Sequence, residues 1–333
     1  MKILINCPSK FNISTQLNDK LGGIESLCIN LAKNLSKKKI KIHIATHNNK
    51  IFFQDKILNF PISKIINNKK KFNYDVVISA NDAKIFKYFP NAKKIFWLHN
   101  TLQIEKAFRR NQLLSIIKFR PIVVYVSNYL KNITSNLYLF KKKIVIPNFL
   151  LPKFKLKKIN YIRKPIFVWS VQRTKGLNEV IKIWCKKINP KFKNAKLYIF
   201  GVDKLNKKKY LNYLLSKNIF YEGRVGKKKL KNIYSKSMGM ICLGYDETFC
   251  LNALEANVCG VPVITFGKTA LKELIYNNYN GYIVKDYSSL ADKIIYTMKL
   301  NKKKRNKIIN NCINFSKKYD IKKISSRWRK IIK

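Results

Sequence analysis

Two glutamates, Glu247 and Glu255, stand eight positions apart in the segment GYDETFCLNALEANVCGVPVI, which covers residues 244–264. An apolar run at 240–243 precedes them, so we expect Glu247 in a strand-to-helix turn and Glu255 two turns into the helix. Backbone N–H groups at the start of a helix bind anions such as phosphate. A carboxylate beside a phosphate would repel it unless it had another task. We infer that this task is to accept hydrogen bonds from sugar hydroxyls.

The whole segment resembles the E-x7-E motif of retaining glycosyltransferases of family 4, which have the GT-B fold. The downstream residues Ala256, Gly260 and Pro262-Val263-Ile264 match the same family pattern. The resemblance extends over most of the chain. It implies that Glu247 faces the donor sugar and that Glu255 binds the ribose hydroxyls of the nucleotide. An ordinary strand-to-helix turn with two solvated acids is the alternative interpretation.

The resemblance also implies a phosphate site built from backbone amides. These are the amides at the start of the same helix: Phe249, Cys250 and Leu251. Many family members have glycine where Cys250 stands, and an amide donor survives that exchange. A glycine pair after the first predicted strand, Gly22-Gly23, is expected to approach the donor phosphates and the acceptor. A plain helix-entry turn is the alternative for the glycine pair.

The resemblance further implies that a basic pair in the stretch WSVQRTKGL holds the donor diphosphate. Arg173 would bind it through its forked guanidinium and Lys175 as a point charge, and both would stabilise the departing nucleotide. The family more often places the arginine directly after a glycine and farther from the lysine. Solvated loop charges are the alternative. Together with Glu247 and His99, these two residues make up the predicted catalytic set.

His99 follows an apolar run in FWLHN, where many family members have His-Asp and this chain has His99-Asn100. The resemblance implies contact with the donor sugar or acceptor, and a structural histidine is the alternative. The nucleotide base is expected near the ends of two later strands. Four residues there complete the predicted donor site: Gly201, Gly223, Arg224 and Val225. A surface role for Arg224 fits the sequence equally well.

Alternating strand and helix patterns predict an α/β fold. Apolar runs such as 3–7, 76–79, 166–170 and 263–266 are separated by helical patterns, which favours parallel sheets. We predict two doubly wound, Rossmann-like domains facing across a cleft, as in GT-B. The predicted segments are an acceptor-side domain at 1–150, a basic linker at 151–164, a donor domain at 165–310, and C-terminal helices at 311–333 that pack back on the first domain.

The composition is unusually basic. The 333 residues carry 70 Lys and Arg against 16 Asp and Glu, a formal net charge of +54. Such a charge attracts polyanions, but its clusters, 227–229 among them, are scattered rather than gathered in one arm. Abundant Lys, Asn, Ile, Phe and Tyr also fit compositional drift. Seven cysteines without metal-ligand spacing and no apolar stretch of spanning length favour a cytoplasmic protein with reduced thiols.

We therefore expect a metal-independent, retaining glycosyltransferase of the hexosyltransferase type. No D-x-D pair occurs, so we expect no cofactor and no obligatory metal; the donor is a nucleotide sugar. The expected acceptor is a glycan or lipid-linked molecule, in surface polysaccharide or lipopolysaccharide synthesis. Contact with an anionic membrane would be peripheral, at the inner face of the cytoplasmic membrane, and no nucleic acid is expected. A catalytically silent GT-B partner subunit and a basic nucleic-acid-binding protein are the alternatives.

Overall fold

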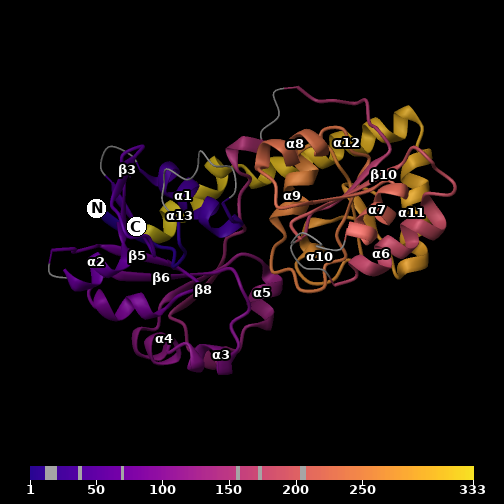
Figure 1. The fold of residues 1–333 in the computed structure, drawn as a ribbon. Coiled ribbons are helices and arrows are strands. Elements are labelled where there is room, and N and C mark those ends of the chain that lie inside the picture. The colour runs from indigo at the N-terminus through magenta and orange to yellow at the C-terminus, as the bar shows by residue number, and fades with distance from the viewer. Residues whose placement is uncertain (12–20, 37–39, 69–70, 155–157, 172–174, 203–207) are drawn as a thin grey trace. The chain divides into compact units, whose positions relative to one another are not determined.

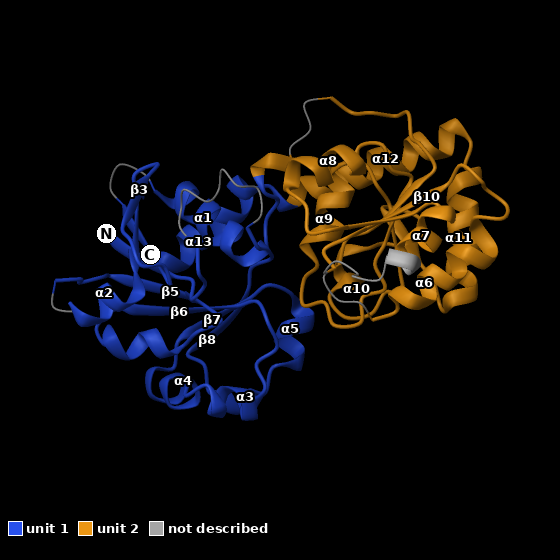
Figure 2. Ribbon diagram, in the orientation of Figure 1, with its two compact units in different colours: residues 1–151, 319–333 blue, residues 152–318 orange. Residues whose placement is uncertain are grey.

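The computed structural model describes residues 1–11, 21–36, 40–68, 71–154, 158–171, 175–202 and 208–333. The chain divides into two compact units (Figure 2). Unit 1 comprises Met1–Leu151 and Tyr319–Lys333, and unit 2 comprises Pro152–Lys318. The predicted linker, 151–164, is therefore part of unit 2 from Pro152 onward. Of the C-terminal segment predicted to pack on the first domain, 311–333, the residues up to Lys318 also belong to unit 2. Arg163 ties the predicted linker to unit 2, because its guanidinium donates to the carbonyls of Tyr234, Ser235 and Cys259.

Unit 1 is built on an eight-stranded sheet, ordered β3-β4-β2-β1-β5-β6-β7-β8. All neighbours are parallel except β3 and β4. Its elements are β1 (Lys2–Asn6), α1 (Gly23–Leu35), β2 (Lys41–Thr46), β3 (Phe52–Gln54), β4 (Ile57–Pro61), α2 (Ile62–Asn67), β5 (Val76–Ala80), η2 (Lys84–Tyr88), β6 (Lys93–Leu98), α3 (Ile104–Arg109), α4 (Leu113–Phe119), β7 (Ile122–Tyr125), α5 (Asn128–Ile133), η3 (Asn136–Tyr138), β8 (Lys142–Val145) and α13 (Ile321–Ile332).

Unit 2 contains a six-stranded, all-parallel sheet, ordered β11-β10-β9-β12-β13-β14. Its elements are η4 (Pro152–Phe154), β9 (Ile166–Trp169), α6 (Leu177–Ile183), the π-helical turn η5 (Trp184–Ile188), β10 (Lys196–Phe200), α7 (Lys208–Ser216), β11 (Ile219–Gly223), α8 (Lys227–Tyr234), β12 (Gly239–Ile241), α9 (Leu251–Val258), β13 (Val263–Thr265), α10 (Leu271–Leu274), β14 (Gly281–Ile283), α11 (Tyr287–Lys299) and α12 (Lys302–Ser316). The turn η6 (Lys317–Tyr319) carries the chain from unit 2 back to unit 1.

The central strands β5 and β9 are buried along their whole length and almost entirely apolar. Strands covered by helices on both faces read as continuous apolar runs rather than alternating ones, which explains why the sequence signal is strong here. The strand order reverses between β9 and β12 in unit 2. In open α/β sheets, ligands bind outside the carboxyl ends of the strands at such a reversal.

The last helix of the chain packs within unit 1. Figure 1 shows α13 beside α1, and Trp328 of α13 is fully buried with its ring 4.8 Å from the ring of Trp97. The Arg329 guanidinium donates to the carbonyl of Asn34, at the end of α1. Ile324 and Ile332 are buried on the same side of α13. The apolar side of this helix therefore faces the interior of unit 1.

Candidate active site

The loop from β12 to α9 carries Glu247. Gly244 has a left-handed backbone (φ 79°), and a Cβ there would lie 2.6 Å from the Leu271 side chain. Two hydrogen bonds fasten the loop to the segment after β13. Thr269 Oγ1 donates to the Gly244 carbonyl at 2.9 Å, and the Ala270 amide donates to the Glu247 carbonyl at 3.1 Å. Glu247 is half-buried. Because the two hydrogen bonds anchor the loop, the backbone that carries its carboxylate is held in place.

Glu255 lies in the second turn of α9, which begins at Leu251. Its side chain is only 1% exposed. Lys227, the first residue of α8, places its Nζ 2.8 Å from Oε1 and 2.9 Å from Oε2. Burial raises the pKa of Glu255, and the Lys227 charge acts in the opposite direction. The site therefore contains a buried carboxylate whose charge is balanced by one lysine.

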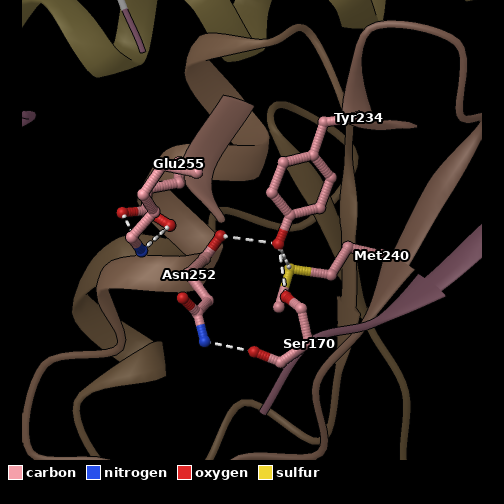
Figure 3. A network of polar contacts seen from close by, with 6 residues as sticks. Ser170, Tyr234, Met240, Asn252 and Glu255 are labelled. Carbon is pink, nitrogen blue, oxygen red and sulfur yellow. Dashed lines mark hydrogen bonds and ion pairs between the residues drawn. The ribbon is translucent and has the colours of Figure 1, made fainter. Parts of the chain in front are cut away.

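A polar network joins the end of β9 to α8 and α9 (Figure 3). The Tyr234 hydroxyl hydrogen-bonds with Ser170 Oγ and contacts the Asn252 carbonyl at 3.5 Å and Met240 Sδ at 3.7 Å. The Asn252 side-chain amide donates to the Ser170 carbonyl. Tyr234 is fully buried, so these bonds form away from water, where an unmade bond is costly. The network holds the start of α9 against the end of β9, where the Lys175 loop begins.

Lys175 and Glu247 line the same small pocket, together with Trp169, Val171 and the Leu243–Asp246 segment. The Lys175 Nζ lies 4.8 Å from the centroid of the Tyr245 ring, within the range of a cation–π contact. The Tyr245 hydroxyl is 3.0 Å from the Tyr287 hydroxyl at the start of α11. The structure thus brings two of the predicted catalytic residues together. Arg173 lies outside the described residues.

Cys250 occupies the position that precedes α9 and has a left-handed backbone (φ 67°). Glycine adopts this conformation without a Cβ penalty, whereas a residue with a side chain, such as Cys250, adopts it only at a cost. The Cys250 Sγ lies 3.6 Å from Cys242 Sγ; this contact and burial raise the pKa of Cys250. Cys250 is therefore a buried thiol near neutral pH. Phe249 and Cys250 are buried, and Leu251 is half-buried.

The four residues predicted near the base lie at the carboxyl ends of β10 and β11. Gly201 and Gly223 both have positive φ, and the Gly201 amide donates to the Gly223 carbonyl at 2.9 Å. Arg224 is exposed and Val225 is half-buried. Arg224, Val225 and Gly226 form the short loop from the end of β11 to α8, whose first residue is Lys227.

In unit 1, the predicted residues lie at the ends of other strands. Gly22 precedes α1 and Gly23 is its first residue, while Glu25 accepts a hydrogen bond from Ser9 Oγ at 2.8 Å. Glu25 lines a cavity of about 760 Å³ beyond the ends of β1, β2 and β5. His99, at the end of β6, is 4% exposed, and its amide donates to Asn81 Oδ1 at 2.8 Å. His99 is not among the residues that line this cavity.

Three residues of unit 2 that were not predicted take part in the site. Tyr245 and Tyr287 are in contact although they are 42 residues apart in the sequence, and Lys227 and Glu255 are in contact although they are 28 residues apart. Lys227 belongs to one of the basic clusters seen in the sequence, but no local spacing distinguishes it from Lys228 or Lys229. Within the described part of the chain, no group of three or more His, Cys, Asp and Glu side chains is placed to hold a metal ion.

Several solved structures share the fold of this chain along nearly its whole length. Sucrose-phosphate synthase from Thermosynechococcus elongatus superposes with a TM-score of 0.76 at 13% identity, covering 99% of this chain and 98% of that one. HepE from Anabaena in complex with UDP-glucose gives 0.74 at 15% identity, with coverages of 99% and 98%. WaaG, a glycosyltransferase involved in lipopolysaccharide biosynthesis, gives 0.74 at 13% identity and 99% of both chains. The fold is that of the GT-B glycosyltransferases, as the sequence predicted.

A family match is found within unit 2. Residues 153–315 match the family described as "Glycosyl transferases group 1", so this part of the chain is a domain of that family. No curated protein matches the chain. No helix among the described residues is long and apolar enough to cross a membrane.

Proposed function

We propose that this protein transfers a sugar from a nucleoside-diphosphate sugar to a glycan or lipid-linked acceptor, with retention of anomeric configuration and without an obligatory metal. The observation that carries the proposal is the arrangement of Glu247, Lys175 and Glu255. In a glycosyl transferases group 1 domain, Lys175 and Glu247 line one pocket at the carboxyl ends of β9 and β12, and Glu255 lies in the second turn of α9, the helix that follows β12. A sheet of this kind binds ligands at that place.

Each residue has a distinct role in this proposal. Glu255 accepts hydrogen bonds from the ribose hydroxyls, and Glu247 contacts the donor sugar. Lys175, with Arg173, stabilises the negative charge that develops on the leaving diphosphate, assisted by amides at the start of α9. The bond between the anomeric carbon and the diphosphate oxygen breaks as the acceptor oxygen bonds from the same face. The acceptor proton passes to the leaving phosphate.

The acceptor belongs, in this proposal, to surface polysaccharide or lipopolysaccharide assembly at the inner face of the cytoplasmic membrane. Two observations support this context. The net charge of +54 favours an anionic surface or a phosphorylated substrate. One of the similar structures, WaaG, is described as acting in lipopolysaccharide biosynthesis. The cavity of unit 1, with Glu25 and Asp82 among its polar lining residues, is the proposed place for the acceptor.

A thermal-shift screen with UDP, GDP, ADP and CMP, each with and without EDTA, tests the donor part of the proposal. We expect one nucleotide to raise the melting temperature, with no effect of EDTA and no shift in the Glu255→Ala variant. Proton NMR of the product anomer then tests retention. If none of the nucleotides binds and RNA binds tightly in a salt-sensitive manner, the chain is a nucleic-acid-binding protein instead. If a nucleotide binds but no sugar acceptor is modified, a silent partner subunit fits better.

A further inference from the structure

We propose that Lys227 is a positioning residue of the donor site, which keeps Glu255 charged and aligns its carboxylate for the ribose of the nucleotide. The inference rests on the proposed function, because it concerns the donor site named there. It predicts that nucleotide affinity depends on Lys227 and on pH. Lys227 would not touch the reacting atoms, and its effect would pass through Glu255.

The geometry of the ion pair is the first support. One ammonium nitrogen lies almost equally far from both carboxylate oxygens, at 2.8 and 2.9 Å. The Glu255 side chain is 1% exposed and that of Lys227 is 17% exposed. Among the described residues, Lys227 is the one side chain that donates a hydrogen bond to this carboxylate. Lys227 therefore fixes the direction in which the oxygens of Glu255 point.

The surrounding groups explain why the charge of Glu255 depends on this lysine. Within the described part of the chain, the other titratable groups seen to interact with Glu255 are Tyr234 on α8 and Cys259 at the end of α9. Burial raises the pKa of Tyr234 well above its usual value and that of Cys259 to about 12. Both are therefore neutral near pH 7 and cannot offset burial. Without Lys227, burial alone would act on Glu255, and the carboxyl would stay protonated to higher pH.

Ribose binding requires the charged form in a specific way. Two neighbouring ribose hydroxyls donate to a carboxylate that accepts at both oxygens, whereas a protonated carboxyl must itself donate one proton. The two carboxylate oxygens offer about four acceptor sites, so the ribose hydroxyls can bind while Lys227 keeps its contacts. The Lys227 ammonium is also held by the Phe154 ring, whose centroid lies 5.5 Å from Nζ.

The same helix supplies a matched control. Lys229 forms an ion pair with Glu222 at 2.6 Å, but both side chains are more exposed, at 53% and 28%. Lys229→Met thus removes an equal charge from the same helix and breaks an equivalent pair in water. Exposed pairs contribute little. An effect confined to Lys227→Met is therefore an effect of the buried pair rather than of net charge.

The experiment measures the dissociation constant of UDP by calorimetry between about pH 5 and 8, the range around the usual carboxyl and histidine pKa values. UDP is replaced by whichever nucleotide the screen identifies. We expect wild-type affinity to fall as pH falls. Lys227→Met should weaken binding about tenfold near pH 7 and move the acid loss to higher pH by at least about one unit. Lys227→Arg should restore most of the affinity, and Lys229→Met should match the wild type.

Two further measurements separate positioning from folding. The 2′,3′-dideoxy analogue of the nucleotide lacks the hydroxyls, so its affinity should be the same in wild type and Lys227→Met. The double variant Glu255→Gln with Lys227→Met removes both buried charges and should fold even if the single variant does not. It should bind the nucleotide without the acid loss that depends on Glu255, so that only the titration of the terminal phosphate is left in its pH profile.

Three outcomes decide the matter. Equal pH profiles in wild type and Lys227→Met, with binding lost only in Glu255→Gln, would overturn the role of Lys227 and leave the proposed function intact. Equal losses in Lys227→Met and Lys229→Met would overturn it as well, because net charge would then be the cause. Absence of nucleotide binding to the wild type at every pH would overturn the proposed function and this inference together.

Discussion

Two buried histidines of unit 1 link the stability of that unit to pH. Burial lowers the pKa of His99 to about 3 and that of His43 to about 4, from a usual value of 6.5. His43 Nδ1 is 2.8 Å from the Tyr74 hydroxyl, and the positive charges of Lys2 and Lys41 further disfavour the cation. Both imidazoles are therefore neutral in the folded protein near pH 7. As a consequence, His99 is not a proton donor at that pH.

The sign of the pH effect follows from these shifts. Below pH 6.5 the unfolded chain binds protons on both histidines and the folded protein does not, so the free energy of unfolding falls as pH falls. Each histidine contributes up to about 1.4 kcal/mol per pH unit until its folded pKa is reached. We expect His99→Gln and His43→Gln to reduce this slope in urea titrations between about pH 6.5 and 4.5. An unchanged slope in both variants would contradict the assignment of neutral, buried imidazoles.

At the scale of elements, the Lys175 loop depends on a glycine. Gly176 has φ 86°, and a Cβ there would lie 2.5 Å from Leu243 Cδ1, 3.0 Å from the Tyr287 hydroxyl and 3.1 Å from Tyr245 Cε2. An alanine would push against the two tyrosines that position Lys175. We expect Gly176→Ala to lower stability by about 1–2 kcal/mol and to weaken nucleotide binding.

A second variant separates backbone strain from the steric clash at Gly176. Asparagine tolerates the left-handed region but carries the same Cβ. Gly176→Asn should therefore also weaken nucleotide binding, measured by calorimetry, if the clash with the tyrosines is the cause. Normal binding by Gly176→Asn would show that only the backbone conformation matters.

The elements were more predictable than the contacts between them. Apolar runs such as Ile166–Ser170 predict buried parallel strands, because both faces of those strands meet helices. The strand, turn and helix around Glu247 and Glu255 could also be predicted, because they follow from the spacing of nearby residues. Lys227 could not be predicted, because a lysine in a chain with 70 basic residues carries no signal until the fold brings it to Glu255. The positive φ of Cys250 could not be predicted either, because it is set by the tertiary structure around the turn and not by the local sequence.

At the scale of the whole molecule, the chain ends in the unit where it began. Trp328 is fully buried against Trp97, so the last helix completes the core of unit 1. Replacing a buried tryptophan by alanine costs about 3–5 kcal/mol. We expect Trp328→Ala to lower hydrogen-exchange protection in the strands of unit 1. Trp184, fully buried in unit 2, provides the matched variant: Trp184→Ala should lower protection around β9 and β10. The reverse pattern would contradict the assignment of the last helix to unit 1.

The net charge of +54 and the packing of the last helix together predict how the protein meets a membrane. Three apolar residues of α13, Ile324, Trp328 and Ile332, are buried in unit 1 and are not available for insertion into lipid. We therefore expect attraction to come mainly from lysine and arginine, each worth about 1 kcal/mol near an anionic surface and screened by salt. In vesicle sedimentation, we expect binding to vesicles with anionic phosphatidylglycerol, none to phosphatidylcholine alone, and release at about 0.5 M salt. Salt-resistant binding to neutral vesicles would contradict this prediction, because apolar side chains would then insert, either those of α13 or exposed ones such as Phe108 and Leu114.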